Sequence, residues 1–247
     1  MKKTHWIALA VLFALIWPHS VLSALDPNEI IARADKIRVP EGSYEMEITL
    51  TNYVGEKVDG VSEYRVFVKN LDNSLVEFRA PRTERGKSLL MLEDDFWIYL
   101  PKLRKPVRVP PKQRLLGKVS IGDMVRTNFA HDYDASLIGE EDFKGEAAFV
   151  LDLKAKTKKK TYSRIKYWVA KKDYRPLYAE YFTASGKALK TLTFKEYKLV
   201  EGTKRPMVGE FQDSVQKNKK TLLRFDSLTR KRLKDMMFTK QFMRTLE

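Results

Sequence analysis

The sequence predicts a mainly β protein built on an antiparallel sheet of about ten or eleven strands that is closed or nearly closed. Segments in which apolar and polar residues alternate follow one another along most of the chain, as in residues 44–51. Two further segments, 88–92 and 96–100, are apolar with no alternation, so both of their faces must be covered. Helical spacing is confined to the two ends of the mature chain and a short stretch at 120–126.

Residues 1–24 have the organisation of a cleavable secretory signal. Lys2 and Lys3 form a positive end, and residues 7–17 form an apolar run of about eleven residues, followed by small residues suited to cleavage. A bilayer span needs roughly 20 apolar residues, so this run is too short to be an anchor. The chain has no cysteine, which excludes a lipid-modified cysteine and disulfides. We therefore expect a protein exported to the periplasm.

Residues 25–247 are expected to form a single domain, because they contain neither a second apolar span nor a flexible linker. The whole chain has a net charge of +15, and loss of Lys2 and Lys3 with the signal leaves +13. Such a surplus indicates a polyanionic partner, for example an anionic membrane surface or an acidic protein. Export makes nucleic acid the least suitable partner, and none is predicted.

The mature chain opens with the pattern of a helix start. Asp26 is the expected N-cap, Pro27 is the first helical residue, and Glu29 is placed to complete a capping box. The helix should end near Pro40. Its apolar stripe predicts packing against the core and is formed by Ile30, Ile31, Ala34 and Ile37.

Three alternating strands in residues 44–80 are expected to form an antiparallel meander. Asp94 and Asp95 supply the turn between the two apolar strands that follow, and we expect helices or a lid against one side of the sheet there. After a long interlude with the short helix at 120–126, strands resume and continue in hairpins through residues 147–225.

Apolar residues at the C-terminal end recur at roughly helical spacing among basic residues. Two interpretations stay open, a terminal helix docked on the core and a Met-rich flap over an apolar cavity, because thioethers repack readily around irregular ligands. The apolar residues of this stretch are Leu233, Met236, Met237, Phe238, Phe242, Met243 and Leu246.

No catalytic, metal or cofactor site is predicted. Only His131 remains once the signal is removed, so a triad or a multi-histidine zinc site has almost nothing to build on. The acidic clusters lie where turns are expected, and no glycine-rich phosphate loop occurs. We predict that the protein is not an enzyme. The alternative function among enzymes is a hydrolase that depends on His131 or Asp132.

Two lysine-rich regions, residues 154–160 and 217–232, have two interpretations. They form a solvated surface that keeps strand edges from pairing with other chains, or they dock on an anionic membrane surface or an acidic partner.

An ordered set of short segments runs through nearly the whole mature chain. It consists of residues 75–81, residues 84–91, Phe96-Trp97-Ile98-Tyr99-Leu100-Pro101, Arg108, Gly117, Gly122-Asp123-Met124, Asp132-Tyr133-Asp134 and residues 238–242. In this order the set resembles the periplasmic outer membrane lipoprotein-sorting protein family of the LolA/LolB-like superfamily.

The resemblance implies an unclosed antiparallel β-barrel, or half-barrel, with helices lidding an apolar cavity on its concave side. It also implies a carrier that shelters the acyl chains of a lipid or lipidated protein and moves them between the inner and outer membranes. The implied partner is an inner-membrane transporter or export pump. The alternative is a non-enzymatic accessory subunit that docks on a membrane complex exporting lipids or other hydrophobes.

Alternation along the strands assigns candidate residues to this cavity. The expected lining residues are Met46, Ile48, Leu50, Tyr64, Val66, Val68, Phe78, Trp97 and Tyr99. The orientation of Trp97 and Tyr99 stays open, because the neighbouring apolar residues compete for the same face. The expected lid residues are Met236, Met237 and Phe238.

Overall fold

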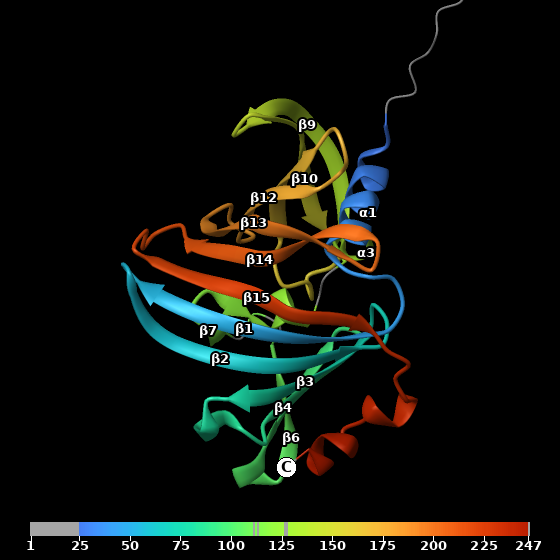
Figure 1. Cartoon of the computed structure of the whole chain (residues 1–247), viewed down its shortest axis with the longest axis vertical. Helices are drawn as coiled ribbons and strands as arrows, with labels where there is room; N and C mark the ends of the chain where they lie inside the picture. The colour runs from blue at the N-terminus through green and yellow to red at the C-terminus, as the bar shows by residue number, and fades with distance from the viewer. Residues whose placement is uncertain (1–24, 111, 113, 126–127, 247) are drawn as a thin grey trace, which may run out of the picture.

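The computed structural model describes residues 25–110, 112, 114–125 and 128–246; the predicted signal lies outside them. These residues form one strongly curved antiparallel sheet of thirteen strands, with helices against its concave side (Figure 1). The strand order is β6-β5-β4-β3-β2-β1-β15-β14-β13-β12-β11-β10-β9. Its edge strands, β6 and β9, do not pair with each other, so the predicted unclosed half-barrel is confirmed.

The first half of the chain supplies one side of the sheet. It contains α1 (Pro27–Arg38), β1 (Tyr44–Val54), β2 (Lys57–Val68), β3 (Asn73–Ala80), η1 (Arg82–Glu84), β4 (Ser88–Leu92), β5 (Asp95–Leu100), η2 (Pro101–Leu103) and β6 (Lys105–Val109). A connecting segment contains the small β7–β8 ribbon and two short helices. Its elements are β7 (Arg114–Leu116), β8 (Val119–Ser120), α2 (Ile121–Val125) and α3 (Phe129–Asp132).

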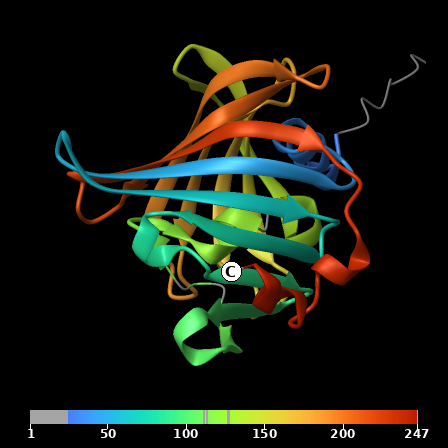
Figure 2. The same cartoon turned by 60° about the horizontal axis from the view of Figure 1, so that its bottom comes forward.

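The second half begins at the opposite edge and returns to the middle. Its elements are β9 (Tyr133–Phe143), β10 (Glu146–Ala155), β11 (Arg164–Ala170), β12 (Pro176–Phe182), β13 (Ala188–Val200), β14 (Thr203–Asp213), β15 (Lys219–Arg230), η3 (Asp235–Met237) and η4 (Phe242–Thr245). The two halves join where β1 pairs with β15, from Tyr44 opposite Arg230 to Val54 opposite Lys219. Figure 2 shows this long central pair crossing the molecule.

The sheet has more strands than the ten or eleven that were predicted, because the alternation of apolar and polar residues in its edge strands is too weak to identify them as strands. The edge strand β9 is exposed along most of its length, so alternation between buried and exposed residues is largely missing there. The segment of β6 is basic and contains Pro106, which an edge strand tolerates. Pairing with a neighbouring strand, which sequence periodicity does not report, makes both segments strands.

The N-terminal helix forms as predicted. The Asp26 Oδ1 atom accepts a hydrogen bond of 2.9 Å from the backbone amide of Asn28 and caps α1. Glu29 does not close a capping box but pairs with Arg33 one turn further along. Three residues of the predicted apolar stripe, Ile30, Ile31 and Ala34, are buried in the main core on the concave side of the sheet, and the fourth, Ile37, is half-buried.

The two non-alternating strands, β4 and β5, are covered on both faces, as predicted. Leu89 and Phe96 belong to the main core on the concave side, which also contains Ile121 and Met124 of α2. Leu90 belongs to a second apolar cluster that packs with the C-terminal segment on the convex side. None of the described helices is both long and apolar enough to cross a membrane.

Candidate functional site

Seven of the nine predicted lining residues share the concave face of the sheet. They are buried members of the main core: Met46, Ile48, Leu50, Tyr64, Val66, Val68 and Phe78. The rings of Tyr64 and Phe78 meet edge to face at 5.0 Å. Val119, Ile121 and Met124 belong to the same core, so β8 and α2 fill this half of the interior with protein. None of the seven lines the cavity described below, and Val68 lines the depression beside it.

Trp97 and Tyr99 do not share that face. Both lie in the second apolar cluster on the convex side, whereas Phe96 and Ile98 pack with the concave core. Their assignment to the cavity wall is therefore corrected. Successive side chains of a strand point to opposite faces of the sheet. Because both faces of β5 are covered by apolar residues, the sequence does not show which pair, Phe96 with Ile98 or Trp97 with Tyr99, faces the concave side.

The predicted lid also lies on the convex side. Phe238 is buried in the second cluster and Met237 packs against it, while Met236 is 62% exposed. Asp235 forms a salt bridge of 2.7 Å with Lys69, which ties η3 to the end of β2. The segment forms short 3-10 turns and not an α-helix. It is docked on the outside of the sheet and does not cover the concave cavity, so the lid assignment is corrected.

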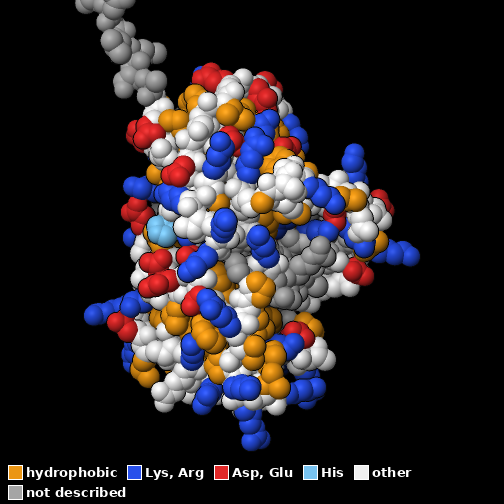
Figure 3. All heavy atoms as spheres, turned by 180° about the vertical axis from the view of Figure 1, so that it is seen from behind, with side chains coloured by type: hydrophobic (Ala, Val, Ile, Leu, Met, Phe, Trp, Pro, Cys, Tyr) orange, Lys and Arg blue, Asp and Glu red, His pale blue; other side chains and the backbone are white. Residues whose placement is uncertain are grey.

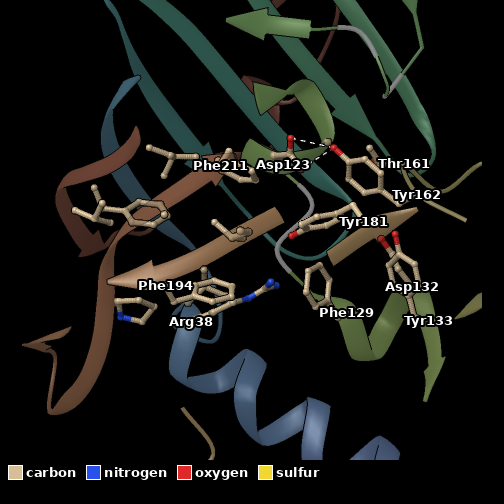
Figure 4. A pocket seen from close by; sticks show the side chains of 18 residues that line it. Arg38, Asp123, Phe129, Asp132, Tyr133, Thr161, Tyr162, Tyr181, Phe194 and Phe211 are labelled. Atoms are coloured by element: carbon tan, nitrogen blue, oxygen red, sulfur yellow. Dashed lines mark hydrogen bonds between the residues drawn. The ribbon is translucent and has the colours of Figure 1, made fainter. Parts of the chain in front are cut away.

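The structure places an apolar cavity in the other half of the interior, under β12–β15 (Figure 4). Rings and aliphatic side chains of these strands make up most of its wall, and α1, α2, α3 and the β10–β11 loop complete it. The lining residues are Arg38, Val39, Gly122, Asp123, Phe129, Asp132, Tyr133, Thr161, Tyr162, Tyr181, Leu192, Phe194, Pro206, Val208, Gly209, Phe211, Leu223 and Phe225.

The cavity is narrow. Its volume is about 70 Å³, which is room for a few water molecules and less than an acyl chain requires. A wider depression of about 350 Å³ lies beside it, between α1, α3 and the β2–β3 turn. Val39 and Asp132 line both spaces, so the two are neighbours at the C-terminal end of α1.

A buried polar network closes one end of the cavity. The Tyr162 hydroxyl donates to Asp123 Oδ1 at 2.9 Å, and the backbone amide of Ser120 donates to Asp123 Oδ2 at 2.7 Å. The Lys190 ammonium pairs with the same carboxylate and donates to the Lys118 carbonyl at 2.8 Å. The network fastens α2 to the β10–β11 loop and to β13 from the concave side of the sheet.

Aromatic rings surround the ammonium of this network. The Lys190 Nζ atom lies 4.4 Å from the centroid of the Phe211 ring, 5.0 Å from that of Tyr162 and 5.3 Å from that of Tyr181. Burial raises the pKa of both tyrosines well above the ordinary value, so their hydroxyls stay protonated. The buried cation is therefore balanced by a carboxylate and by ring faces.

The opposite end is formed by α1 and α3. The Arg38 guanidinium lies 3.9 Å above the centroid of the Phe129 ring and forms a salt bridge of 3.0 Å with Asp35. Burial raises the pKa of Asp35 to about 6, although the charge of Arg38 acts in the opposite direction. Arg205 of β14 donates to the carbonyl oxygens of Lys36 and Ile37 at 2.6 and 2.9 Å, which holds the end of α1 on the sheet.

The Thr161 hydroxyl of the cavity wall is buried and has no hydrogen-bond partner among the described residues. It lies against Gly122, where a Cβ atom would approach it to 2.0 Å. His131 is partly exposed outside the cavity, and its Nδ1 atom lies 3.0 Å from Asp132. In the part of the chain that the structure describes, no group of three or more His, Cys, Asp or Glu is placed to hold a metal ion.

The sequence analysis missed the cavity residues on β13, β14 and β15, although the signal was present. Leu192 and Phe194 alternate on one strand, and Leu223 and Phe225 alternate on another, in the same way as the predicted residues of β1. Alternation shows which face is buried. It does not show whether protein or a cavity covers that face.

Comparison with solved structures identifies the class of protein that this curved sheet and its cavity define. A LolA superfamily protein from Nitrosomonas europaea is 30% identical, with a TM-score of 0.84, and the match covers 89% of this chain and 100% of that one. A provisionally assigned outer membrane lipoprotein-sorting protein domain from Vibrio parahaemolyticus is 24% identical, with a TM-score of 0.75, covering 88% and 98%. A DUF1329 family protein from Desulfovibrio piger is 22% identical, with a TM-score of 0.76, covering 90% and 100%.

These structures have the same half-barrel fold, and the first of them also shows the family. The chain belongs to the LolA superfamily. A family model described only as "-like: Uncharacterized protein" matches residues 70–245. No curated protein matches the chain.

Proposed function

We propose that the protein is a non-enzymatic periplasmic carrier that shelters acyl chains of a lipid or lipidated protein on their way between the inner and outer membranes. The apolar cavity on the concave side of the sheet, lined by β12–β15, is the observation that carries the proposal. Membership of the LolA superfamily supports it. An inner-membrane transporter or export pump is the proposed partner that loads the cavity.

The physical need for such a carrier follows from the hydrophobic effect. Exposing an acyl chain of about 14 methylenes to water costs on the order of 10 kcal/mol. An unaided crossing of an aqueous compartment is therefore negligible. An apolar cavity removes most of that cost without any covalent step, and a polar atom such as the Thr161 hydroxyl can hydrogen-bond to the ligand's head group.

Loading requires the narrow cavity to widen, and we propose that the C-terminal turn of α1 moves while the buried residues Ile30, Ile31 and Ala34 keep the rest of the helix in the core. The C-terminal end of this helix is held by hydrogen bonds from Arg205 and by the contact of Asp35 with Ala130. Polar contacts of this kind exchange for water at low net cost. Movement of this turn would join the cavity to the wider depression beside it, because Val39 lines both spaces.

Native mass spectrometry with lipid extraction tests the proposal, on protein purified from the periplasm without detergent. We expect bound lipid at stoichiometric levels. In the variant Phe225→Asp, a carboxylate is placed at a half-buried position of the cavity wall, and the bound lipid should be lost while the fold is retained. The matched control is Phe182→Asp, also at a half-buried phenylalanine but next to the inward-facing Tyr181 and so on the opposite face.

Lipid that is lost from Phe225→Asp and kept by Phe182→Asp supports the carrier. Wild-type protein that comes out empty contradicts it and favours an accessory subunit of an export complex. Lipid that is kept equally by both variants contradicts the location of the cavity.

A further inference from the structure

Two hairpin turns that are far apart in sequence form a single protruding tip. Residues 54–58 join β1 to β2, residues 215–220 lie at the β14–β15 turn, and we call them together the paired tip. The backbone amide of Gly55 donates to the Asn218 carbonyl at 2.6 Å, so the two turns are linked directly. The paired tip projects at the left of Figures 1 and 2, where the ends of β1 and β14 meet.

Hydrogen bonds from within the β14–β15 turn give it a defined shape. The Asp213 Oδ1 atom accepts from the backbone amides of Val215 and Gln216 at 2.7 and 3.0 Å. The Gln212 side chain donates to the carbonyl oxygens of Lys217 and Lys219 at 2.6 and 3.0 Å. The side chains beyond these anchors are therefore presented outward from a fixed backbone.

The paired tip combines exposed valines with lysines. Val58 is 57% exposed and Val215 is 70% exposed. Four lysines share the tip, and none of them forms a salt bridge in the described part of the chain: Lys57, Lys217, Lys219 and Lys220. Glu56 is the one acidic residue within the two turns. Figure 3 shows this protrusion from behind, at the right, with basic side chains at its outer end.

We propose that the paired tip docks the protein on the surface of an anionic phospholipid bilayer. A protruding tip of two joined turns can enter the head-group layer of a membrane. Valine side chains gain by leaving water there, and lysines keep their ammonium groups beside lipid phosphates while their stems lie in the interface. Each such lysine strengthens binding about fivefold, and salt weakens the effect.

The tip and the cavity are built on the same strands. Phe211 of β14 lines the cavity and Val215 lies four residues further along, which is about 13 Å in an extended chain. Leu223 of β15 lines the cavity four residues after Lys219. Docking through the tip would therefore hold the cavity close to the lipid surface. The docking surface does not depend on what the cavity carries.

Sedimentation with vesicles tests the docking surface. The probes are vesicles of phosphatidylcholine alone and vesicles that contain one-third phosphatidylglycerol. Wild-type protein should sediment with the anionic vesicles and should dissociate from them when the salt concentration is raised. The tip variant replaces all four tip lysines by glutamine and should bind at least a hundredfold more weakly.

The matched control removes the same number of charges from exposed lysines elsewhere: Lys154→Gln, Lys158→Gln, Lys159→Gln and Lys172→Gln. It should bind nearly as well as wild type. A second variant, Val58→Ser with Val215→Ser, keeps the charge and should weaken binding several-fold. Equal losses in the tip variant and the control would overturn the proposal, and so would binding that is independent of phosphatidylglycerol.

Discussion

The Asp35 carboxylate of α1 accepts a hydrogen bond of 2.8 Å from the backbone amide of Ala130 in α3. The same carboxylate pairs with Arg38, whose guanidinium stacks on Phe129 at the cavity wall. The buried carboxylate of Asp35 thus joins α1 to the connecting segment that contains α3. Its protonation state bears on how firmly α1 is held over the cavity.

Stability should depend on pH through Asp35. Burial raises its pKa from 3.8 to about 6, so the folded state holds this proton more tightly than the unfolded state. Its contribution is complete below pH 4 and is lost as pH rises through about 6. The stability of wild type relative to Asp35→Asn should therefore fall between pH 4 and pH 7, by on the order of 3 kcal/mol. Urea unfolding at both pH values measures this difference, and a rise would contradict it.

The buried pair of Asp123 and Lys190 should be costly to break. Lys190→Met leaves the Asp123 carboxylate buried beside Tyr162 without its cation and should destabilise the fold by about 3–5 kcal/mol. Lys190→Met combined with Asp123→Asn should cost less than the sum of the two single changes, because neither charge is left alone. Loss of the exposed pair of Arg224 and Glu196 in a parallel cycle should change little. Additive effects at the buried pair would refute the coupling.

Gly122 should not tolerate a side chain. A Cβ atom there would lie 2.0 Å from the Thr161 hydroxyl and 2.8 Å from its methyl group, so Gly122→Ala should destabilise by about 1–3 kcal/mol. Gly139→Ala is the matched control, since a Cβ atom at Gly139 meets nothing within 4 Å. Thermal unfolding of the two variants should differ clearly. Equal midpoints would mean that α2 does not pack this closely on the β10–β11 loop.

The C-terminal segment should stabilise the convex face without controlling access to the cavity. Met243→Ala removes a fully buried side chain from the second cluster and should cost about 2–5 kcal/mol. Met236→Ala, at an exposed position, should cost almost nothing. Neither variant should change the amount of bound lipid under conditions where the protein is folded. Loss of bound lipid from the Met236→Ala variant would contradict this prediction and would support a lid function for the C-terminal segment.

Much of the architecture could be predicted from the sequence, because its signals are local. Asp26 and Pro27 mark the start of α1, and alternation from Met46 onward identifies a strand with one buried face. The continuous apolar run at Phe96 requires cover on two faces, and the structure has that cover. The order of the motifs also indicated the LolA superfamily. The first three inferences depend on residues within one or two turns or strands of each other, and the motif order extends from residue 75 to residue 242.

The location of the cavity depended on the tertiary structure. Ile48 and Leu223 lie on the same concave face and are both buried, but α2 belongs to the core around the first and the cavity lies beside the second. Trp97 and Phe96 are both large aromatic residues, and the side that each faces depends on the pairing of β5 with its neighbours. Periodicity along a strand reports that a face is covered. What covers it is decided by contacts between segments a hundred or more residues apart, such as Ser88 with Met243.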